Sequence, residues 1–559
     1  MFSLKVTVLS LLVALFLILA YRSHGENLYC GKTDQTAYMG TALSLREQGG
    51  PASFPKLCFT GAYKQANQQP LYILAISPLA ARNIQFFIKA KILSTVIAFV
   101  FFLVLFVIVN KEFGFLASAA GISLMLTSYL FIKYLSMVAC EYLLITFTLL
   151  TWYFTTKGFK DNKSWITGGL FSGLAYLSKA SALLYLPVFL LSSFIIALKN
   201  NNWKKIFLNK YFVYYFLAFI LVSFPLLYRN TVIYNNPFHT VNSKTMWLDN
   251  SQEYNHPELI EKSGPVKYFK THSFDQIFKR VAYGFKTQSR NFFNAYRGYL
   301  FDFPDPVYGW YLYVGIYLLL PVLSIAFIFR DNDYSRKIYT VVLFLLFYAS
   351  LVWFSVIGPS YRYALPVISI FMIYSGVGIG DLLERFAEKI RPLKDSGGNT
   401  ALMLVAVSLG LICLVTFIKT DFRKNPGEMY AYHDGEEALA GWMKSKLLDR
   451  DIVLQEDMYL YPYALTSAPF SRIKSKRIHL PLVSSFAEIS DFIKTEQADY
   501  VILTKKGIEN KKKIFKPYFE LTPDESMRVR ALPQGWELTY ADPEPPVSFL
   551  IFKISRNSL

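Results

Sequence analysis

The sequence predicts a polytopic α-helical membrane protein that carries a small α/β domain at its C-terminal end. Of its 559 residues 53% are hydrophobic and only 17% are charged, whereas soluble domains carry about 25% charged residues. Phe and Tyr are abundant, at 49 and 39 residues, as expected for side chains that face lipid or its interfaces. Many apolar runs also approach the roughly 17–25 residues that a membrane-spanning helix needs.

Eleven such apolar runs can be distinguished along the chain. The first is longer than the roughly 7–15 apolar residues of a cleaved signal peptide and lacks a small-residue cleavage site, so we expect a retained anchor. The runs cover residues 4–21, 86–109, 115–132, 141–156, 164–178, 180–198, 211–228, 311–329, 338–357, 364–380 and 400–418.

The segment 69–82, QPLYILAISPLAAR, is the ambiguous element. It contains Pro78 and would be about 20 Å long as a helix, which is shorter than the bilayer core. If it does not span, the basic loops all fall on the cytoplasmic side, as the positive-inside bias requires. These loops carry Lys111, Lys157, Lys160, Lys163, Lys199, Lys204, Lys205, Lys210, Arg330, Arg336, Lys337, Arg385, Lys389, Arg391 and Lys394. We therefore expect a helix that lies on the outer surface.

This topology divides the chain into a membrane domain, 1–418, and an outer domain, 419–559. The N-terminus is cytoplasmic, and two large outer loops cover 22–85 and 229–310. The outer domain has mixed charges, strand-like runs such as DIVLQ and DYVILT, and a helical pattern in GEEALAGWMKSKLL. A small extracytoplasmic α/β domain is expected there.

The net charge of +19 does not indicate a nucleic-acid partner. Membrane proteins collect Lys and Arg in short cytoplasmic loops, which explains the excess. None of the four cysteines forms a Cys-x-x-Cys pair, so zinc and thioredoxin-type sites are not expected. Cys30 and Cys58 share the first outer loop, where an oxidising compartment would allow a disulfide; two unpaired thiols are the alternative.

Ionisable residues gather at the predicted outer ends of the spans. A cation in such a place is often an interfacial anchor, and an acid that begins a helix often only complements the helix dipole. Ionisable groups at membrane depth are nevertheless costly and usually functional. Two acids and three cations on one side suit a ligand that carries a phosphate and a group to deprotonate. These residues are Asp34, Glu141, Lys179, Arg229 and Arg362, the last followed by Tyr363.

Taken in order, these features resemble the C-type (GT-C) membrane glycosyltransferases, especially the protein O-mannosyltransferase and lipid A aminoarabinose transferase families. The shared features are an acid in the first outer loop, a surface helix that opens Pro-Leu-Tyr at Pro70, an acid that starts the fourth span, a Lys in a short outer turn and a late Arg-Tyr pair. The resemblance covers roughly residues 1–380 and depends on order and spacing. Asp34 is followed here by Gln35, where the family often has a second acid.

The resemblance implies an inverting transfer of a sugar from a polyprenyl-phosphate donor to an extracytoplasmic acceptor, which would be a lipid, a glycan or a protein hydroxyl. Arg362 and Lys179 would bind the donor phosphate, with Tyr363 and Arg229 as further candidates. The predicted general base is Asp34. The remaining candidates are Glu141, which would position the acceptor or Asp34 or share a divalent cation with it, and Pro70 and Tyr72, which would form part of the lipid entrance.

The resemblance also implies a bacterial inner membrane, with the site facing the exterior. A transporter or flippase for lipid-linked saccharides is the main alternative, and a non-catalytic assembly protein is another. Transporters commonly show inverted repeats and broken helices at the membrane midplane. The sequence has no evident repeat, and its charged residues lie at the outer rim, which favours the transferase. The sugar and the acceptor are left open.

Overall fold

The chain divides by its internal contacts into two compact units. Unit one comprises Met1–Glu26, Gly49–Ala75 and Lys91–Pro426, and unit two comprises Asn27–Gln48, Ile76–Ala90 and Gly427–Leu559. The structure is a computed structural model, and it describes residues 2–28, 33–81, 85–201, 203–250, 253, 257–295, 319–358, 360–389, 397–420, 422, 442–443, 445–448, 451–455, 476–479, 485–505, 508, 512–522, 526–541 and 549–555.

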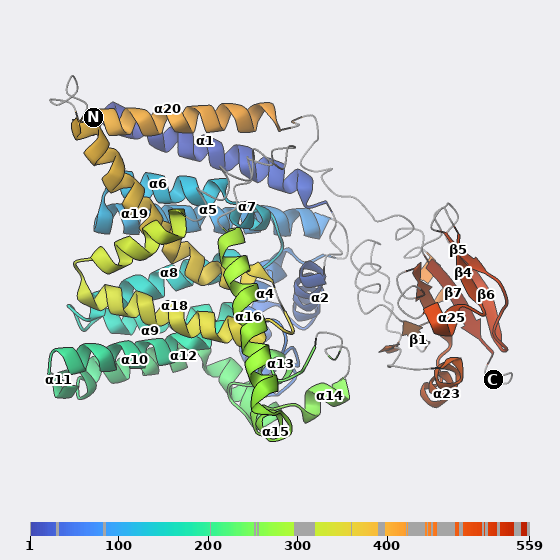
Figure 1. The fold of residues 1–559 in the computed structure, drawn as a ribbon. Coiled ribbons are helices and arrows are strands. Elements are labelled where there is room, and N and C mark those ends of the chain that lie inside the picture. Colours follow the sequence, from blue (N-terminus) through green and yellow to red (C-terminus); the bar gives the residue numbers. More distant parts are fainter. Residues whose placement is uncertain are drawn as a thin grey trace. The chain divides into compact units, whose positions relative to one another are not determined.

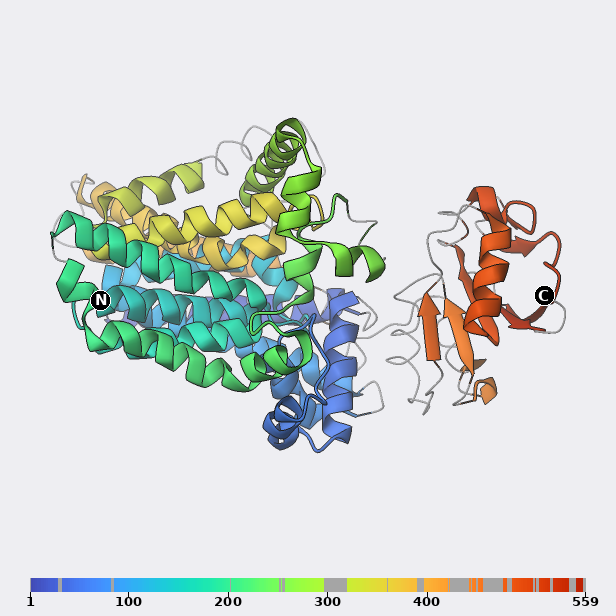
Figure 2. The same ribbon diagram turned by 90° about the horizontal axis from the view of Figure 1, so that it is seen from below.

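Unit one is a bundle of long apolar helices (Figures 1 and 2). The eleven predicted runs are helical over most of their described residues, although the run 115–132 is interrupted at the extended residue Ser128. Within the described residues, seven helical segments are long and apolar enough to cross a membrane, so the predicted fold class is confirmed. The helices are α1 (Phe2–Glu26), α5 (Gln85–Phe113), α6 (Phe115–Thr127), α8 (Glu141–Gly158), α9 (Ser164–Ser178), α10 (Tyr185–Lys199), α12 (Lys210–Tyr234), Leu319–Arg330, α18 (Tyr334–Phe354), α19 (Leu365–Lys389) and α20 (Gly397–Ile418).

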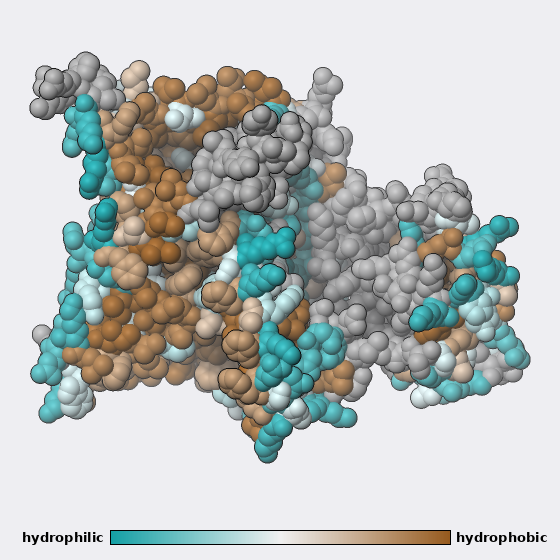
Figure 3. Space-filling model, in the orientation of Figure 1, coloured by the Kyte–Doolittle hydropathy of each residue, from teal (hydrophilic) through white to brown (hydrophobic). Residues whose placement is uncertain are grey.

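Glycines allow the helices of the bundle to approach closely. A Cβ atom at Gly169 of α9 would lie 2.0 Å from the carbonyl oxygen of Tyr215 in α12. One at Gly376 of α19 would lie 2.5 Å from the amide nitrogen of Gly121 in α6. Without the side chain the backbones can touch, as is common between membrane helices. On the face seen in Figure 3, the exposed side of the bundle between its two ends is largely apolar.

An ion-pair network joins the helix ends that carry the predicted cytoplasmic loops. Arg336, in the first turn of α18, lies 2.6 Å from Asp331 and 2.6 Å from Glu112 at the end of α5. Tyr374 of α19 donates a hydrogen bond of 2.8 Å to Asp331. The side chains of Arg336 and Asp331 are 11% and 2% exposed. Arg336, which the sequence analysis counted among the basic residues of a cytoplasmic loop, therefore packs between helix ends instead.

Short helices and one longer helix, α16, gather at the other end of the bundle. In Figure 1, α11 (Trp203–Phe207) marks one end, and α13, α15 and α16 lie at the opposite end. The segment 69–82 forms only the short helix α4 and the 3-10 turn η2, so it is too short to span the bilayer. The helical elements at this end of the bundle are η1 (Pro51–Ser53), α3 (Phe54–Phe59), α4 (Pro70–Ile76), α7 (Tyr129–Tyr134), α13 (Val241–Thr245), α14 (Pro257–Lys262), α15 (Pro265–Thr271) and α16 (Phe274–Ala295).

Unit two contains α2 (Thr33–Glu47) and η2 (Ser77–Leu79), which are joined by a hydrogen bond from Arg46 to the carbonyl of Pro78. Its C-terminal part holds a five-stranded mixed sheet of order β2-β1-β3-β7-β6, in which β1 pairs parallel with β2 and β3, and β7 pairs antiparallel with β3 and β6. The strands are β1 (Ile452–Gln455), β2 (Lys476–His479), β3 (Tyr500–Thr504), β6 (Trp536–Ala541) and β7 (Phe549–Ile554), with a separate hairpin of β4 (Phe519–Leu521) and β5 (Met527–Val529).

Helices complete this α/β region, as the sequence predicted. Ser485 caps α23 (Phe486–Glu496) by accepting a hydrogen bond from the amide of Glu488. Ile489 and Ile493 of α23 pack in one core with the sheet and with Phe515 of α25 (Lys512–Phe515). The predicted strands DIVLQ and DYVILT are β1 and β3, whereas the predicted helix GEEALAGWMKSKLL lies largely outside the described residues. The boundary at 418/419 stays a prediction.

Candidate active site

Glu141 is fixed at the start of α8 by the turn that precedes it. Thr95 donates a hydrogen bond of 2.9 Å to the carbonyl of Leu135 in this turn, and the hydroxyl oxygens of Ser136 and Ser23 lie 2.9 Å apart. The carboxylate is in the first turn of the helix, where the helix dipole favours a negative charge. Its side chain is only 4% exposed, so it needs a partner.

Lys179 is that partner. It ends α9 in an extended conformation, with φ of −156° and ψ of 134°, and so interrupts the helix before the 3-10 turn η3 (Ala180–Leu184). Its Nζ lies 3.1 Å from Oε1 of Glu141. The same amine stands 4.9 Å from the ring centroid of Tyr363, which is within the range of a cation–π contact.

Arg362 and Tyr363 reach this ion pair from the 3-10 turn η5 (Tyr361–Ala364), directly before α19. Arg362 donates a hydrogen bond of 3.2 Å to the hydroxyl of Tyr363. The Tyr363 ring packs edge-on against Phe354, with ring centroids 5.6 Å apart. The charge of Arg362 acts on both Glu141 and Lys179. The structure thus brings four of the predicted site residues together in one cluster.

The described members of this cluster are two cations, Arg362 and Lys179, one tyrosine and one carboxylate, of which one oxygen has no hydrogen-bond partner among the described residues. Oε2 of Glu141 is buried and makes no hydrogen bond within the described part of the chain. Because a buried polar atom without a partner costs free energy, such an atom indicates a place for a ligand group or water. Arg362 and Lys179 would neutralise an anion that binds beside them.

The pKa of Lys179 depends on the ion pair. Burial is the largest single effect and lowers this pKa, but Glu141, together with Cys140 and Tyr363, outweighs it, and the net shift is upward. A group whose pKa is higher in the folded than in the unfolded state stabilises the fold below its unfolded-state value. This contribution is therefore complete at neutral pH and is lost as the pH rises through the folded-state pKa of Lys179.

We expect the pair to show strong coupling in a double-mutant cycle. Lys179→Met removes the cation that contacts the buried Glu141 carboxylate, and a broken buried pair costs about 3–5 kcal/mol. Adding Glu141→Gln removes that charge and restores part of the loss. Unfolding of the purified variants in one detergent, at neutral pH, measures the free energies. Strictly additive single-variant effects would show that the two side chains are not coupled.

Arg229 does not join the cluster and has a different role in the structure. Its side chain is buried in α12, and its Nη1 donates to the carbonyls of Tyr63 and Gln65, at 3.2 and 2.6 Å. Its guanidinium also faces the ring of Tyr63, 5.3 Å from the centroid. Arg229 thus holds the backbone of the segment that follows α3, and we do not include it among the proposed phosphate ligands.

Pro70 and Tyr72 are buried inside the protein. Tyr72 is 1% exposed, and its hydroxyl lies 2.6 Å from that of Ser94 in α5. The electrostatic influence of Glu141 reaches this hydroxyl. Tyr72 is thus a buried residue within electrostatic reach of Glu141, and its part in a lipid entrance stays a prediction.

Asp34 lies in unit two, in the first turn of α2, and is half-buried. Its neighbour Gln35 is fully buried and forms two amide hydrogen bonds with Asn27, of 2.9 and 3.0 Å. Within unit two, this pair ties the first turn of α2 to the chain that precedes it. The glutamine that stands where the family often has a second acid is therefore a structural residue here.

The predicted disulfide stays a prediction. Cys58 is a free, buried thiol in the structure, and Cys30 lies outside the described residues. Burial raises the pKa of Cys58 to about 12, against a smaller opposing effect of Arg229. The thiol is therefore protonated at neutral pH and a poor nucleophile.

Sequence reasoning missed the residues that position Glu141. Lys91 of α5 is buried and donates a hydrogen bond of 2.8 Å to the carbonyl of His24. The imidazole Nε2 of His24 lies 2.9 Å from the Thr95 hydroxyl, which also contacts the turn before α8. These contacts tie α1 to α5. The sequence signal that could have identified these contacts is Lys91, a charged residue inside an apolar run.

Comparisons with known proteins bear on the class of this fold. The model of the family described as dolichyl-phosphate-mannose-protein mannosyltransferase matches residues 73–228. No curated protein matches the chain by sequence. The matched region contains Glu141 and Lys179, and it is one part of the stretch of roughly residues 1–380 over which the sequence suggested the resemblance.

Solved structures share the fold across nearly the whole chain. ArnT from Cupriavidus metallidurans bound to undecaprenyl phosphate matches with a TM-score of 0.50 and 11% identity, covering 97% of each chain. The oligosaccharyltransferase of Archaeoglobus fulgidus, solved with a tethered acceptor peptide, matches with a TM-score of 0.55 and 12% identity, covering 94% of this chain and 74% of that one. The expected resemblance to GT-C glycosyltransferases is thus confirmed, and the fold is theirs.

Proposed function

We propose that this protein transfers a sugar from a polyprenyl-phosphate donor to a hydroxyl of an extracytoplasmic acceptor. The observation that carries the proposal is the cluster of Glu141, Lys179, Arg362 and Tyr363, in which two cations lie beside a carboxylate with one oxygen that has no hydrogen-bond partner among the described residues. The GT-C fold and the mannosyltransferase family match support it. The structural relative ArnT binds undecaprenyl phosphate, a lipid of the proposed donor class.

The two cations suit the leaving group of such a donor. Cleavage of the sugar–phosphate bond leaves the negative charge on the phosphate, and fixed cations stabilise it as it develops. The guanidinium of Arg362 can bind two phosphate oxygens at once, whereas Lys179 acts as a point charge. Glu141 orients Lys179 through the 3.1 Å contact, and Tyr363 supports both cations from one ring.

Asp34 is the proposed general base. The acceptor hydroxyl gives its proton to the Asp34 carboxylate while its oxygen forms a bond to the anomeric carbon of the sugar. The bond from that carbon to the phosphate oxygen breaks, and the polyprenyl phosphate leaves with the electron pair. A single displacement of this kind inverts the anomeric centre, and the base needs only hydrogen-bond reach of the hydroxyl.

The described residues do not by themselves provide the ligands for a divalent cation. Mg²⁺ and Ca²⁺ take about six or more oxygen ligands, and no group of three or more His, Cys, Asp or Glu side chains occurs in the described residues. Oε2 of Glu141 is one available donor. The predicted cation therefore stays a prediction, and the proposed displacement of the polyprenyl phosphate uses protein groups alone.

The ends of the helices indicate on which side the reaction occurs. Lys157 ends α8 and Lys199 ends α10, whereas Glu141 begins α8, so the cluster lies at the end opposite to these lysines. Because basic residues favour the cytoplasmic side, we place the site on the outer face. A bacterial inner membrane is the proposed location.

Reconstituted protein tests the function directly. Purified protein in phosphatidylcholine vesicles would receive labelled polyprenyl-phosphate-linked mannose and crude cell envelope as acceptor. Transfer of label to envelope material, inhibited by added undecaprenyl phosphate, is expected. Movement of the labelled donor across the bilayer without transfer would overturn the proposal and support the flippase.

A further inference from the structure

Over most of its length helix α16 has the reverse of the usual amphipathic arrangement, because the residues that it turns toward the bundle are polar or small until Phe292, which is buried near the end of the helix. Arg280 is 6% exposed and Gln288 is 2% exposed. The Gln288 amide donates a hydrogen bond of 2.7 Å to the hydroxyl of Ser355. A Cβ atom at Gly284 would lie 1.9 Å from the carbonyl oxygen of Val352, so the helix rests directly on the backbone of α18.

An apolar stripe on the same helix remains exposed. Phe274, Phe278 and Phe285 are 83%, 61% and 59% exposed, and Val281 between them is 39% exposed. Their spacing of four, three and four residues places all four on one side of the helix. A soluble helix buries such a stripe against its own core, so this stripe requires an apolar environment outside the protein.

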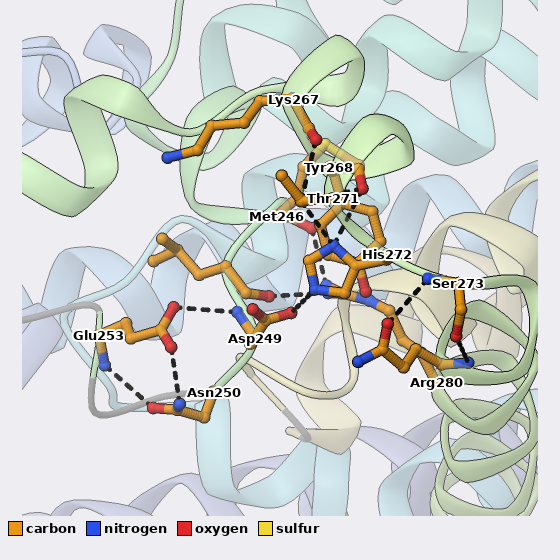
Figure 4. A network of polar contacts seen from close by, with 12 residues as sticks. Met246, Asp249, Asn250, Glu253, Lys267, Tyr268, Thr271, His272, Ser273 and Arg280 are labelled. Carbon is orange, nitrogen blue, oxygen red and sulfur yellow. Dashed lines mark hydrogen bonds and ion pairs between the residues drawn. The ribbon is translucent and has the colours of Figure 1, made fainter.

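The helix cannot turn this stripe inward, because polar contacts hold it in place. Arg280 donates to the carbonyls of Leu248 and Met246, at 2.7 and 2.8 Å. Beside it, Nε2 of His272 lies 2.9 Å from a carboxylate oxygen of Asp249. Figure 4 shows these residues converging on the chain between α13 and α16. The contacts of Arg280 with the carbonyls of Leu248 and Met246 therefore fix the orientation of α16.

The direction of α16 and its charges identify the environment. In Figures 1 and 2 the helix runs across the ends of the long bundle helices, so it lies along the plane of the membrane surface. Three basic residues, Lys279, Lys286 and Arg290, are exposed on the flank next to the stripe. Lys279 pairs with Asp275 at 2.6 Å. The other two basic side chains match the charge of lipid phosphates.

We propose that α16 is an interfacial helix that docks on the outer leaflet of an anionic phospholipid bilayer. Phe274, Phe278 and Phe285 insert at the boundary between headgroups and acyl chains, and Lys286 and Arg290 bind headgroup phosphates. An apolar stripe bordered by basic residues is the pattern of helices that lie in this interface. The proposal is independent of sugar transfer, because it concerns only the exposed faces of α16.

Two labelled variants of the full-length protein test the proposal. In a cysteine-free background, Phe278→Cys and Tyr283→Cys would each carry a nitroxide label. The control position, Tyr283, is also an exposed aromatic, at 53%, but five residues along a helix place it about 140° around the axis. The protein would be reconstituted in phosphatidylcholine with and without phosphatidylglycerol, and collisions of each label with oxygen and with a water-soluble nickel chelate would be measured.

The expected result is a higher ratio of oxygen to nickel collisions at position 278 than at position 283. Phosphatidylglycerol should increase this ratio at position 278, and the added pair Lys286→Gln and Arg290→Gln should remove the increase. Equal ratios at the two positions would overturn the proposal, and so would an increase that survives the loss of both cations. If Phe278→Cys folds poorly, Phe285→Cys reports on the same stripe with the same expected result.

Discussion

The Asp34→Asn variant is expected to lose sugar transfer by about 10²–10⁴-fold, which is the usual contribution of a positioned general base. Asparagine keeps the size and hydrogen-bonding shape of the side chain but cannot accept the proton of the acceptor hydroxyl. The change removes one acid from the first turn of α2, which costs only about 0.3–1 kcal/mol of helix stability. Initial rates with labelled donor and acceptor, at saturating donor, measure the effect.

A neighbouring substitution provides the control for Asp34. Gln35→Ala removes the amide pair with Asn27 and leaves a buried amide without its partner, which costs about 1–3 kcal/mol. We expect this variant to unfold at a lower temperature but to transfer sugar once folded. Near-normal turnover by Asp34→Asn would exclude it as the base. A parallel loss of stability in Asp34→Asn would show that its role is structural.

Arg362→Lys is expected to lower kcat/KM for the donor by about 10²–10³-fold, as for the loss of one fixed group that stabilises transition-state charge. Lysine keeps the positive charge but cannot bind two phosphate oxygens in one plane. Most of the loss should appear in kcat, because the phosphate gains its charge as the sugar leaves. Steady-state kinetics with varied donor separates kcat from KM.

Arg229→Lys is the matched control for Arg362→Lys, since both exchange an arginine for a lysine. Arg229 donates to the carbonyls of Tyr63 and Gln65 from a buried position. Its replacement should lower the unfolding temperature and leave kcat nearly unchanged. If Arg229→Lys reduced kcat as strongly as Arg362→Lys, the assignment of the phosphate-binding arginine would be wrong.

The helical fold was predictable because apolar runs and basic loops directly reflect the bilayer. Each predicted run is mostly helical where the structure describes it, and the short segment that follows Gln69 does not span, as the charge distribution indicated. The strands of the C-terminal region were predictable where short apolar runs alternate with turns. Their order, with β7 between β3 and β6, depends on contacts distant in sequence.

The site was predictable in its residue types but not in its partnerships. Glu141, Lys179 and Arg362 stand at helix ends where charges are unusual, so the sequence identified them. The sequence could not separate Arg362 from Arg229, because both follow an apolar run; only the structure shows that Arg229 holds backbone carbonyls. The role of Lys91 was equally hidden, since its partner is the carbonyl of His24.

The central claim is that the proton acceptor and the phosphate-binding cations face the same, non-cytosolic side of the membrane. Cysteines placed singly at positions 34 and 362, in a cysteine-free background, would be exposed to a membrane-impermeant maleimide in intact cells that produce the protein. We predict that both react before permeabilisation and that undecaprenyl phosphate slows the reaction at position 362. Reaction of either cysteine only after permeabilisation would place that group on the cytosolic side and contradict the mechanism.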